Sequence, residues 1–394
     1  MAKIEVNNVF KVFGSNPKKV FPLIEKGLSK EEILEKTGNT IGVNDVSFKV
    51  NQGEMFVVMG LSGSGKSTLI RCLNRLIEPT KGDVLIDGEN VATADKEKLR
   101  EIRRKKMAMV FQNFALFPHR TVASNVEYGL EIQGVEPDKR KNKAYEALDL
   151  VGLKGYEESM PDELSGGMQQ RVGLARALAN DPDILLMDEA FSALDPLIRK
   201  EMQDELLDLQ DKMHKTIVFI THDLDEALKL GDRIVIMKDG AVVQIGTAEE
   251  ILTEPADEYV REFVQDVDRS KVVTAESIMR KPDALISSKD GPRMAVRKMK
   301  EEELSSVYVT DRHRKLKGVV RIEDTMELIS DGKKSLDEII IEDVPTTSPD
   351  TPIIDLLPKA KDSEYPIAVV DENEKLLGII VRASIILGIV GEEE

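Results

Sequence analysis

The order of apolar and polar positions in the first 265 residues predicts alternating strands and helices. Residues 4–9 and 44–50 alternate apolar and polar side chains, which is typical of strands with one exposed face. Continuous apolar runs predict strands that are buried on both faces at 54–59, 107–111, 184–189 and 216–221. Apolar residues recur at helical spacing in 69–76 and in much of 121–160. Strands that alternate with helices favour an α/β fold.

A helical insertion interrupts the first two strands. Residues 16–37 follow the turn at Gly14, and Ser29 stands where the N-cap of a helix beginning at Lys30 is expected. The alternating strand pattern resumes only at residue 44. The insertion is therefore predicted to be an addition to the strand pair.

Composition and charge narrow the class of protein. The 394 residues carry a net charge of −17, and 32% of them are charged, which argues against general nucleic-acid binding. No apolar run approaches the roughly 20 residues that span a bilayer, and the N-terminus lacks the pattern of a signal peptide. Cys72 is the single cysteine, so we expect it to fill the core. We expect a cytoplasmic chain of two or three domains.

A glycine-rich loop is the strongest chemical signal in the chain. Residues 60–68 fill the pattern G-x-x-x-x-G-K-[ST] between a predicted strand and a predicted helix. Backbone N–H groups at such a helix N-terminus form an anion site, Lys66 can reach the β- and γ-phosphates, and Ser67 can hold Mg²⁺. The predicted nucleotide-binding residues of this loop are Gly60, Ser62, Gly63, Ser64, Gly65, Lys66, Ser67 and Thr68.

Other segments supply the polar groups that triphosphate chemistry needs. The buried strand 184–189 ends in Asp188 and Glu189, a costly arrangement unless a metal ion or substrate meets the carboxylates. Asp188 is predicted to hold Mg²⁺, and Glu189 to polarise an attacking water molecule. His222 follows the strand 216–221, at the kind of strand end where ligands of open α/β sheets gather.

Two more segments are candidates for binding. A predicted helix opens with Ser165, Gly166 and Gly167, which offer a hydroxyl group and bare backbone to a second anion. Gln112 ends the strand 107–111, and residues 113–119 after it are too apolar for an ordinary surface loop, which suggests a protein contact.

Aromatic and basic residues leave two questions open. Phe10 and Phe13 belong either to the core or to a platform for a nucleotide base, where stacking typically contributes about 1–3 kcal/mol. Residues 95–106 are the one dense basic cluster, which is either a solvated helix face or a contact for anionic lipid headgroups worth about 1 kcal/mol per residue. Arg100, Arg103 and Arg104 share a helical stripe there, with Lys98, Lys105 and Lys106 beside it.

In this order, the motifs resemble the ATPase subunit of an ATP-binding cassette (ABC) transporter from the N-terminus to about residue 265, with a helical subdomain at about residues 113–165. The correspondences are Phe13 with the adenine-stacking aromatic, Gly60–Thr68 with the Walker A loop, Gln112 with the Q-loop glutamine, Leu164–Gln169 with the signature motif, Ile184–Glu189 with Walker B, Ser192–Asp195 with the D-loop, and His222 with the switch histidine.

The resemblance implies hydrolysis of ATP with Mg²⁺. In the family's scheme, Lys66, Ser67 and Asp188 hold the phosphates and the metal ion. Gln112 senses the metal and the water, and His222 contacts the γ-phosphate, while Glu189 acts as general base. Ser165 and Gly167 of a second copy close the site, so that two ATP molecules are sandwiched in a head-to-tail dimer.

Residues 27–38 and 73–80 resemble the subfamily of glycine betaine/proline betaine importers. This implies a peripheral subunit on the cytoplasmic face of the membrane. Its partners would be a transmembrane permease, met through residues 114–118, and a substrate-binding domain or protein. The alternatives are an ABC ATPase for another small solute, a soluble ABC ATPase without a role in transport, and a nucleotide sensor with an inactive cassette. The intact Glu189 and His222 argue against the sensor.

The remainder of the chain contains an internal repeat. Residues 305–320 and 365–380 share the order strand, polar turn, strand and then helix. They resemble a tandem of cystathionine-β-synthase-type (CBS) regulatory domains at 271–330 and 336–391. Neither copy keeps the hydroxyl residue of the nucleotide-binding motif Gly-x-[Ser/Thr]-x-x-Asp, and the second copy also lacks its Asp. Arg321 and Arg382 offer cationic forks suited to phosphate. We therefore predict a ligand dominated by phosphate charge, such as cyclic di-AMP, with a purely structural dimerisation module as the alternative.

Overall fold

The computed structural model describes residues 2–112, 114–265, 267–282, 284–287 and 289–390. The chain divides into two compact units, Met1–Gln265 and Asp266–Glu394. Each unit is described by itself below. No helix in the described ranges is both long and apolar enough to cross a membrane.

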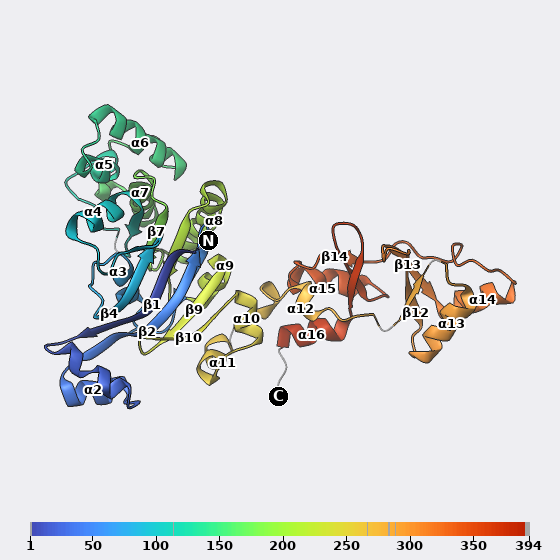
Figure 1. Cartoon of the computed structure of the whole chain (residues 1–394). Coiled ribbons are helices and arrows are strands. Elements are labelled where there is room, and N and C mark those ends of the chain that lie inside the picture. The colour runs from blue at the N-terminus through green and yellow to red at the C-terminus, as the bar shows by residue number, and fades with distance from the viewer. Residues whose placement is uncertain (1, 113, 266, 283, 288, 391–394) are drawn as a thin grey trace. The chain divides into compact units, whose positions relative to one another are not determined.

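A six-stranded sheet forms the centre of the first unit (Figure 1). Its strands are β3 (Met55–Met59), β6 (Met107–Val110), β7 (Ile184–Asp188), β8 (Thr216–Ile220), β9 (Arg233–Lys238) and β10 (Ala241–Gly246). The order is β10-β9-β3-β8-β7-β6, and neighbouring strands are parallel except for the antiparallel pair β9–β10. Every residue of β3, β7 and β8 is buried, as expected for central strands that are covered on both faces.

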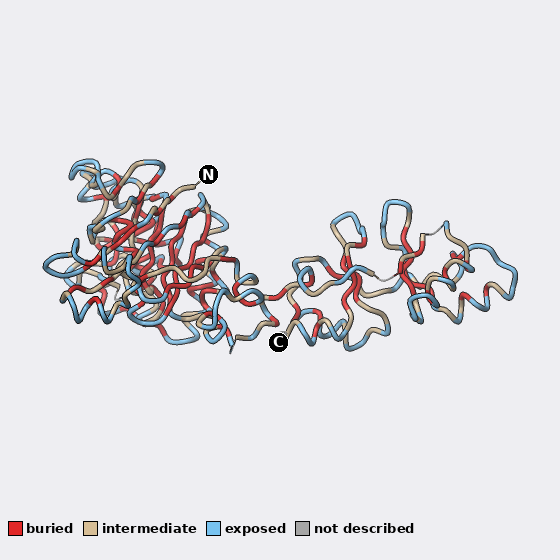
Figure 2. The backbone as a smooth tube through the Cα atoms, turned by 60° about the horizontal axis from the view of Figure 1, so that its bottom comes forward, coloured by how far each residue is buried: buried red, intermediate tan, exposed pale blue. Residues whose placement is uncertain are grey.

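A four-stranded antiparallel sheet packs against the first. It consists of β1 (Ala2–Phe13), β2 (Thr40–Asn51), β4 (Lys81–Ile86) and β5 (Glu89–Asn90), in the order β2-β1-β4-β5. Val6 and Ile86 of this sheet share one buried core with Phe56 and Val218 of the parallel sheet. Figure 2 shows this concentration of buried residues within the first unit.

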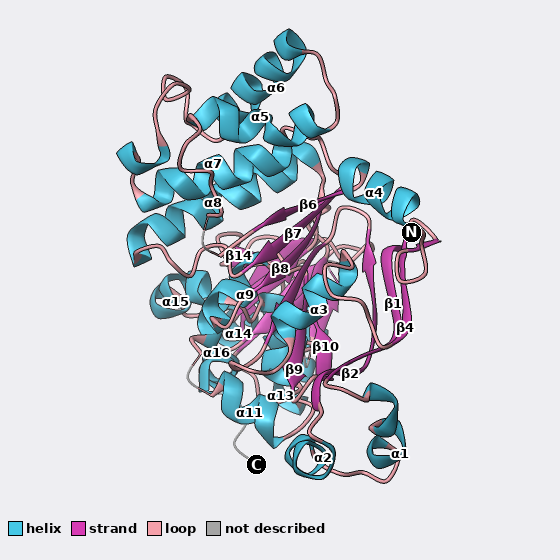
Figure 3. Ribbon diagram, turned by 90° about the vertical axis from the view of Figure 1, so that its left-hand side faces the viewer, coloured by secondary structure: helices cyan, strands magenta, loops and turns pink. Residues whose placement is uncertain are grey.

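Helices flank the sheets of the first unit (Figure 3). They are η1 (Pro17–Lys19), α1 (Phe21–Ile24), α2 (Lys30–Thr37), α3 (Lys66–Leu73), α4 (Lys96–Lys105), α5 (Val122–Ile132), α6 (Pro137–Leu150), η2 (Pro161–Glu163), α7 (Gly166–Leu178), α8 (Pro196–Met213), α9 (Leu224–Leu230), α10 (Ala248–Thr253) and α11 (Glu258–Val264). Helices α5, α6 and α7 pack on one another and form a helical subdomain. This subdomain carries the candidate signature segment at the start of α7.

The second unit contains two small sheets with their own helices. Along the chain, η3 (Arg269–Lys271) and α12 (Ala275–Ile278) come first, and both pack against elements of the second copy. The first sheet and its helices comprise β11 (Leu285–Ser287), α13 (Pro292–Glu301), β12 (Ser306–Thr310), β13 (Leu316–Arg321) and α14 (Ile322–Ser330). The second comprises β14 (Thr346–Thr347), α15 (Ile353–Asp362), β15 (Ile367–Val370), β16 (Leu376–Ile380) and α16 (Arg382–Val390). In each sheet a parallel pair precedes an antiparallel pair, in the orders β11-β12-β13 and β14-β15-β16. Tyr308, Val319, Ala368 and Ile379 join the two sheets in one buried cluster.

The predicted alternation of strands and helices is confirmed, and so is the α/β fold class. Ser29 is the N-cap of α2. Cys72 is fully buried, and burial raises the pKa of its thiol to about 12, which suits a core residue.

The interpretation of the basic stripe needs a correction at Arg103. Its guanidinium is partly buried and donates to the backbone carbonyls of Asn74 and Arg75 at 2.8 Å each, so this side chain binds the end of α3 and does not project as an exposed cation. The neighbouring lysines are ion-paired: Lys98 and Lys106 with Glu89, and Lys105 with Glu101. Arg100 and Arg104 remain exposed.

The apolar segment after Gln112 is only partly exposed. Asn113 lies outside the described residues. Phe117 packs against Tyr128 with 4.5 Å between ring centroids, and Arg176 donates to the carbonyls of Phe114 and Ala115 at 3.0 and 2.6 Å. The segment is therefore fixed to the helical subdomain, with Ala115 and Pro118 left exposed.

Candidate functional site

The glycine-rich loop connects β3 to α3. Gly60, Gly63 and Gly65 have φ values of 147°, 83° and 101°, which L side chains rarely adopt. A Cβ on Gly65 would lie 2.2 Å from the carbonyl oxygen of Gly42, so a side chain there would collide with the neighbouring backbone. The sequence thus provides a loop of bare backbone at the N-terminus of a helix, which is an anion-binding geometry.

The polar side chains of the loop suit a phosphate group. Lys66 is 5% exposed, and its Nζ donates to the carbonyls of Gly60 at 2.8 Å and Leu61 at 3.0 Å. Burial lowers the pKa of Lys66, while the carboxylates of Glu189 and Asp188 oppose this shift. Within the described residues, the hydroxyl of Ser64 is buried without a hydrogen-bond partner. The Lys66 ammonium and the Ser64 hydroxyl are therefore suited to bind an anion. Ser62 is exposed in the same loop.

Asp188 and Ser67 form a small polar cluster at the start of α3. The Ser67 hydroxyl donates to Oδ1 of Asp188 at 2.9 Å, and Arg71 reaches Oδ2 at 3.3 Å. In the described part of the chain, no group of three or more His, Cys, Asp or Glu side chains is arranged to hold a metal ion. A carboxylate with a hydroxyl fits Mg²⁺, which commonly takes one or two protein oxygens and completes its shell with water and substrate phosphates.

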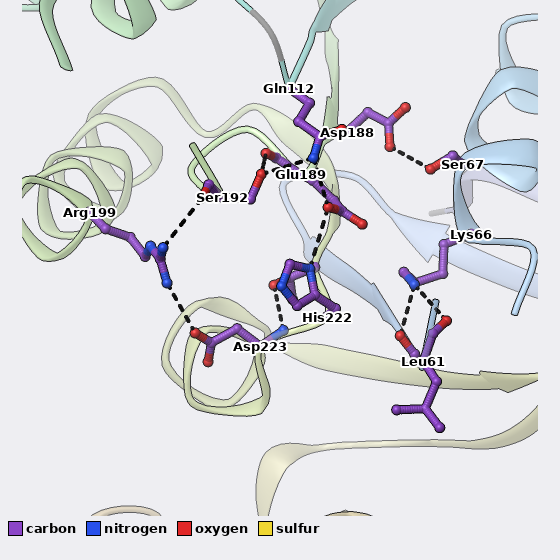
Figure 4. A network of polar contacts seen from close by, with 12 residues as sticks. Leu61, Lys66, Ser67, Gln112, Asp188, Glu189, Ser192, Arg199, His222 and Asp223 are labelled. Carbon is purple, nitrogen blue, oxygen red and sulfur yellow. Dashed lines mark hydrogen bonds and ion pairs between the residues drawn. The ribbon is translucent and has the colours of Figure 1, made fainter. Parts of the chain in front are cut away.

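Three predicted catalytic side chains meet near the ends of β6, β7 and β8 (Figure 4). Gln112 Nε2 lies 3.2 Å from Oε2 of Glu189 and 3.2 Å from the Ser192 hydroxyl. His222 Nδ1 lies 3.4 Å from the same oxygen of Glu189. Glu189 has φ of 47°, an uncommon value for a residue other than glycine, and such strain tends to occur at functional sites.

The two candidate aromatic residues have different environments. Phe10 is 8% exposed and packs edge-on against Phe21 with 5.4 Å between ring centroids, so it belongs to the core. Phe13 is 39% exposed. A Cβ placed on Gly42 would lie 2.7 Å from the Phe13 ring and 3.2 Å from Thr68, so the exposed ring lies close to the end of the phosphate loop.

The candidate signature residues begin α7. The Ser165 hydroxyl caps the helix by accepting from the Met168 N–H at 3.3 Å. A Cβ on Gly167 would lie 2.6 Å from Ile198, and the nearest heavy atoms to one on Gly166 belong to Phe114 and Leu194. Among the described residues, no hydrogen bond or ion pair joins residues 165–167 to the phosphate loop of the same chain.

The D-loop segment begins α8. Asp195 is the N-cap, and its Oδ1 accepts from the N–H groups of Leu197 at 3.2 Å and Ile198 at 3.1 Å. Leu197 is 69% exposed and Leu61 of the phosphate loop is 57% exposed. Large apolar side chains in the phosphate loop and in the first turn of α8 are candidates for contact with another protein surface.

The two arginines predicted to bind phosphate already have partners within the second unit. Arg321 forms a two-pronged contact with Asp324, at 2.7 and 3.2 Å. Arg382 donates to the carbonyls of Ala360 and Ser363 at 2.9 and 2.8 Å, which satisfies the end of α15. A phosphate ligand at either residue would have to share or replace these contacts.

Comparisons with known proteins agree with this geometry. The family model described as ABC transporter matches residues 43–192, and the CBS domain model matches residues 275–331 and 336–391. The glycine betaine/carnitine transport ATP-binding protein of Listeria monocytogenes is 56% identical over 100% of this chain and 99% of its own length. The chain belongs to the ATP-binding subunits of ABC transporters.

Two further relatives extend this result to other organisms. The glycine betaine transport ATP-binding protein of Bacillus subtilis is 56% identical over 100% of this chain and 93% of its own length. The glycine betaine/proline betaine transport ATP-binding protein of Escherichia coli is 52% identical over 98% of this chain and 96% of its own length. The dimeric structure of a bacterial ABC transporter cassette matches with a TM-score of 0.53 and 33% identity, over 62% of this chain and 98% of the other.

The predicted resemblance to an ABC ATPase with a CBS pair is confirmed by these matches. As an ABC ATP-binding subunit, the chain binds and hydrolyses ATP. The structure brings Lys66, Ser67, Asp188 and Glu189 together with Gln112 and His222, whereas the signature residues and Asp195 lie at the N-termini of α7 and α8.

Two arginines that contact the site were not predicted from the sequence. Arg71 contacts Asp188 and stands four residues after Ser67, so the helical spacing of the two could have indicated a shared face. Arg199 donates to the carbonyls of Ser192 and Leu194 and pairs with Asp223 at 3.4 Å, which links the D-loop to the loop of His222 (Figure 4). The ion pair between Arg199 and Asp223 joins segments that are distant in sequence, so no local sequence pattern could indicate it.

Proposed function

We propose that this chain is the ATP-hydrolysing motor subunit of a membrane importer for glycine betaine or a related compatible solute. The observation that carries the proposal is the identity of 52–56% to three betaine transport subunits across both the cassette and the CBS tail. Relatives named for trimethylamine N-oxide and choline transport are 51% and 40% identical over 80% and 90% of the chain. These names keep the substrate class within small methylated amines.

The chemical step requires positioning more than covalent catalysis. Backbone N–H groups of the phosphate loop and Lys66 hold the phosphates. Glu189 orients and deprotonates the attacking water, and Gln112 and His222 hold its carboxylate in place. His222 is 57% exposed in one chain, which leaves it free to contact the γ-phosphate.

Mg²⁺ fits beside Ser67 and Asp188, where it would neutralise charge on the phosphates. Arg71 occupies one oxygen of Asp188 in the structure, at 3.3 Å. We expect this arginine to compensate the buried carboxylate when no metal ion is bound, because an unpaired buried charge is costly.

A second copy of the chain completes the site in this proposal. Ser165, Gly166 and Gly167 form the N-terminus of α7, and the exposed residues that could meet it are Leu61 in the phosphate loop and Leu197 in the first turn of α8. A head-to-tail pair, in which each signature segment faces the partner's phosphate loop, encloses two ATP molecules. The dimeric cassette among the solved structures supports the pairing of two copies.

The permease is proposed to dock beside the Q-loop. A cavity of about 290 Å³ lies between the parallel sheet and the helical subdomain, and its lining includes Leu76, Met109, Phe111 and Tyr128. Its lining also includes Arg176, which donates to the carbonyls of Phe114 and Ala115. An apolar groove of this kind suits a short helix of a partner protein. Movement of Gln112 on ATP hydrolysis would be transmitted to this groove. A substrate-binding domain or protein is the further partner.

We place the subunit at the cytoplasmic face of the membrane as a peripheral protein. Arg100 and Arg104 would contact anionic lipid headgroups there. The neighbouring lysines would contribute less, because they already form ion pairs with Glu89 and Glu101. Since the Debye length falls from about 30 Å at 0.01 M salt to about 8 Å at 0.15 M, rising ionic strength would release such a contact.

The CBS tail is proposed to bind cyclic di-AMP and to inhibit the motor. The lining of a cavity of about 730 Å³ includes the cations of Lys361 and Arg382, the ring of Tyr365, and the carboxylates of Asp362 and Glu364. In a dimer, two such modules on symmetry-related chains could hold a two-fold-symmetric ligand with two phosphates. Arg321 would exchange Asp324 for a phosphate group, and binding would fix the spacing of the two motors.

The experiment for the transport function is co-purification of the tagged chain with a membrane permease, followed by uptake of labelled glycine betaine into vesicles. We expect ATP-dependent uptake that is lost with Lys66→Ala and competed by methylated amines. Uptake of an unrelated solute class, or failure of the tagged chain to retain any membrane partner, would contradict the proposal.

The tail is tested separately by calorimetric titration of the full chain with cyclic di-AMP in the presence of saturating ATP, beside a chain that ends at residue 270. We expect heat of cyclic di-AMP binding, and inhibition of ATP-dependent uptake by this ligand, only with the full chain. Absence of both would leave the tail as a dimerisation module.

A further inference from the structure

The inserted segment forms a lobe at the end of the β1–β2 strand pair. Phe13 pairs with Thr40 at the end of this ladder, so residues 14–39 form the connection between the two strands. Val12, Val20, Ile33 and Ile41 form a small buried core of their own. The lobe is thus a packed structure that begins directly after Phe13.

The first turn of α2 is held in a fixed direction. Ser29 and Glu32 form a reciprocal capping box: the Ser29 hydroxyl accepts from the Glu32 N–H at 3.2 Å, and the Glu32 carboxylate accepts from the Ser29 N–H at 2.8 Å. Ile33 follows at 0% exposure and anchors the same turn in the lobe's core. Lys30 lies between these anchors, so its backbone is well positioned.

Lys30 reaches the phosphate loop. Its Nζ donates to the carbonyl oxygen of Gly63 at 3.2 Å. Gly63 lies three residues before Lys66, which itself donates to Gly60 and Leu61. Two lysines therefore donate to carbonyl groups of one short loop, one from α3 and one from the inserted lobe.

The ammonium group of Lys30 has capacity for a further acceptor. An ammonium carries three N–H donors, and the Gly63 carbonyl is the single acceptor found for Lys30 within the described residues. No carboxylate in those residues lies within ion-pair distance of it, in contrast to Lys98, Lys105 and Lys106. An uncompensated positive charge beside a phosphate-binding loop favours an anionic partner.

We propose that Lys30 is a further nucleotide-binding residue, which holds the phosphate loop at Gly63 and pairs with the terminal phosphate of bound ATP. The proposal rests on ATP binding at the loop. It gives the insertion a function: the lobe adds one cation to the site at a position that the cassette's own motifs do not fill. A terminal phosphate carries the charge that distinguishes ATP from ADP, so Lys30 contributes to the preference for ATP.

The test is calorimetric titration of the full-length protein with the β,γ-imido analogue of ATP and with ADP, both with Mg²⁺ and at one ionic strength. Lys30→Met removes the ammonium and keeps the apolar stem. Lys36→Met is the matched control, because it removes the same charge from the exposed end of the same helix, where within the described residues Lys36 has no side-chain hydrogen bond or ion pair. Lys30→Arg tests rescue by another cation.

We expect Lys30→Met to weaken the ATP analogue about three- to tenfold, as for a charge-assisted contact at a partly exposed site, and to leave ADP within about twofold. Lys36→Met should bind both nucleotides like the unaltered chain, and Lys30→Arg should recover most of the affinity. Equal losses for the two nucleotides, or equal behaviour of Lys30→Met and Lys36→Met, would overturn the proposal. Failure of the unaltered chain to bind the analogue would instead count against ATP binding at the loop.

Discussion

Nδ1 of His222 lies 3.4 Å from Oε2 of Glu189. The two residues follow neighbouring parallel strands, in which Asp188 pairs with Ile220. Gln112 reaches the same carboxylate oxygen from the end of β6 at 3.2 Å. Three strand ends therefore converge on one oxygen atom, so Gln112 and His222 both orient the carboxylate that we propose meets the attacking water.

Glu189→Gln should abolish most of the turnover while ATP binding persists. The amide keeps the shape of the side chain but cannot accept a proton, so we expect kcat to fall about 10²–10⁴-fold, the typical contribution of a general base. Steady-state phosphate release and nucleotide affinity measure the two effects. Glu201→Gln is the control, because Glu201 is exposed on α8. Hydrolysis by Glu189→Gln within about twofold of the control would contradict the assignment.

His222→Ala should be non-additive with Glu189→Gln. Because both side chains serve one carboxylate–water geometry, the double variant should lose little more activity than the worse single variant. The measurement is a double-mutant cycle on kcat. If the two losses multiply, the residues act independently, and the 3.4 Å contact has no catalytic meaning.

Glu226 is predicted to make stability depend on pH. Burial raises the pKa of its carboxyl group, Asp223 adds to the shift, and hydrogen bonds with Thr221 and Gln203 oppose it. A carboxyl whose pKa is higher in the folded state contributes most at low pH, and this contribution is lost as the pH rises above the unfolded value. The melting temperature of Glu226→Gln relative to that of the unaltered chain should therefore increase as the pH rises above the unfolded pKa of about 4.3.

The control for this effect is Asp225→Asn on the exposed side of α9. Scanning calorimetry of all three proteins across the pH series gives the difference directly. A Glu226→Gln difference that stays constant with pH would mean that the buried carboxyl does not titrate as its surroundings indicate.

Charge reversal at Arg100 and Arg104 should weaken binding to anionic vesicles. Each basic residue near such a surface is worth about 1 kcal/mol, so Arg100→Glu/Arg104→Glu should lose at least about tenfold at low salt. Lys98→Glu/Lys105→Glu is the comparison pair, because these lysines are already compensated by Glu89 and Glu101. Co-sedimentation over a salt series measures both. Equal losses for the two pairs would identify a general charge effect, and no loss would identify a solvated face.

The sequence was most informative where local pattern and chemistry coincide. The burial of β3, β7 and β8 followed from continuous apolar runs, and the phosphate loop followed from the spacing of its glycines and Lys66. Strands β9 and β10 were not predicted. The first strand of each CBS copy was also missed, since β11 and β14 have only three and two residues and offer little periodicity. Helices α13 and α15, which follow these strands, were not predicted either.

Side-chain contacts across the fold were the least predictable part. Arg103 looked like one more exposed cation in a basic stripe, and its attachment to the end of α3 depends on tertiary packing. The partners of Arg321 and Arg382 were likewise invisible from sequence spacing alone, except that Asp324 stands three residues after Arg321. Lys30 needed the lobe to bring it to Gly63.

The most direct measurement is the ATPase activity of a mixture of two inactive variants. Lys66→Ala disables the phosphate loop. Ser165→Asp retains a good helix N-cap but places a negative charge where the partner's γ-phosphate is expected. In a head-to-tail dimer, each mixed pair keeps one site with an intact loop and an intact signature segment. Equal mixing should therefore restore about a quarter of the sites, because half of the dimers are mixed and each has one intact site. If the mixture is no more active than the two variants alone, ATP is not hydrolysed between two copies of this chain.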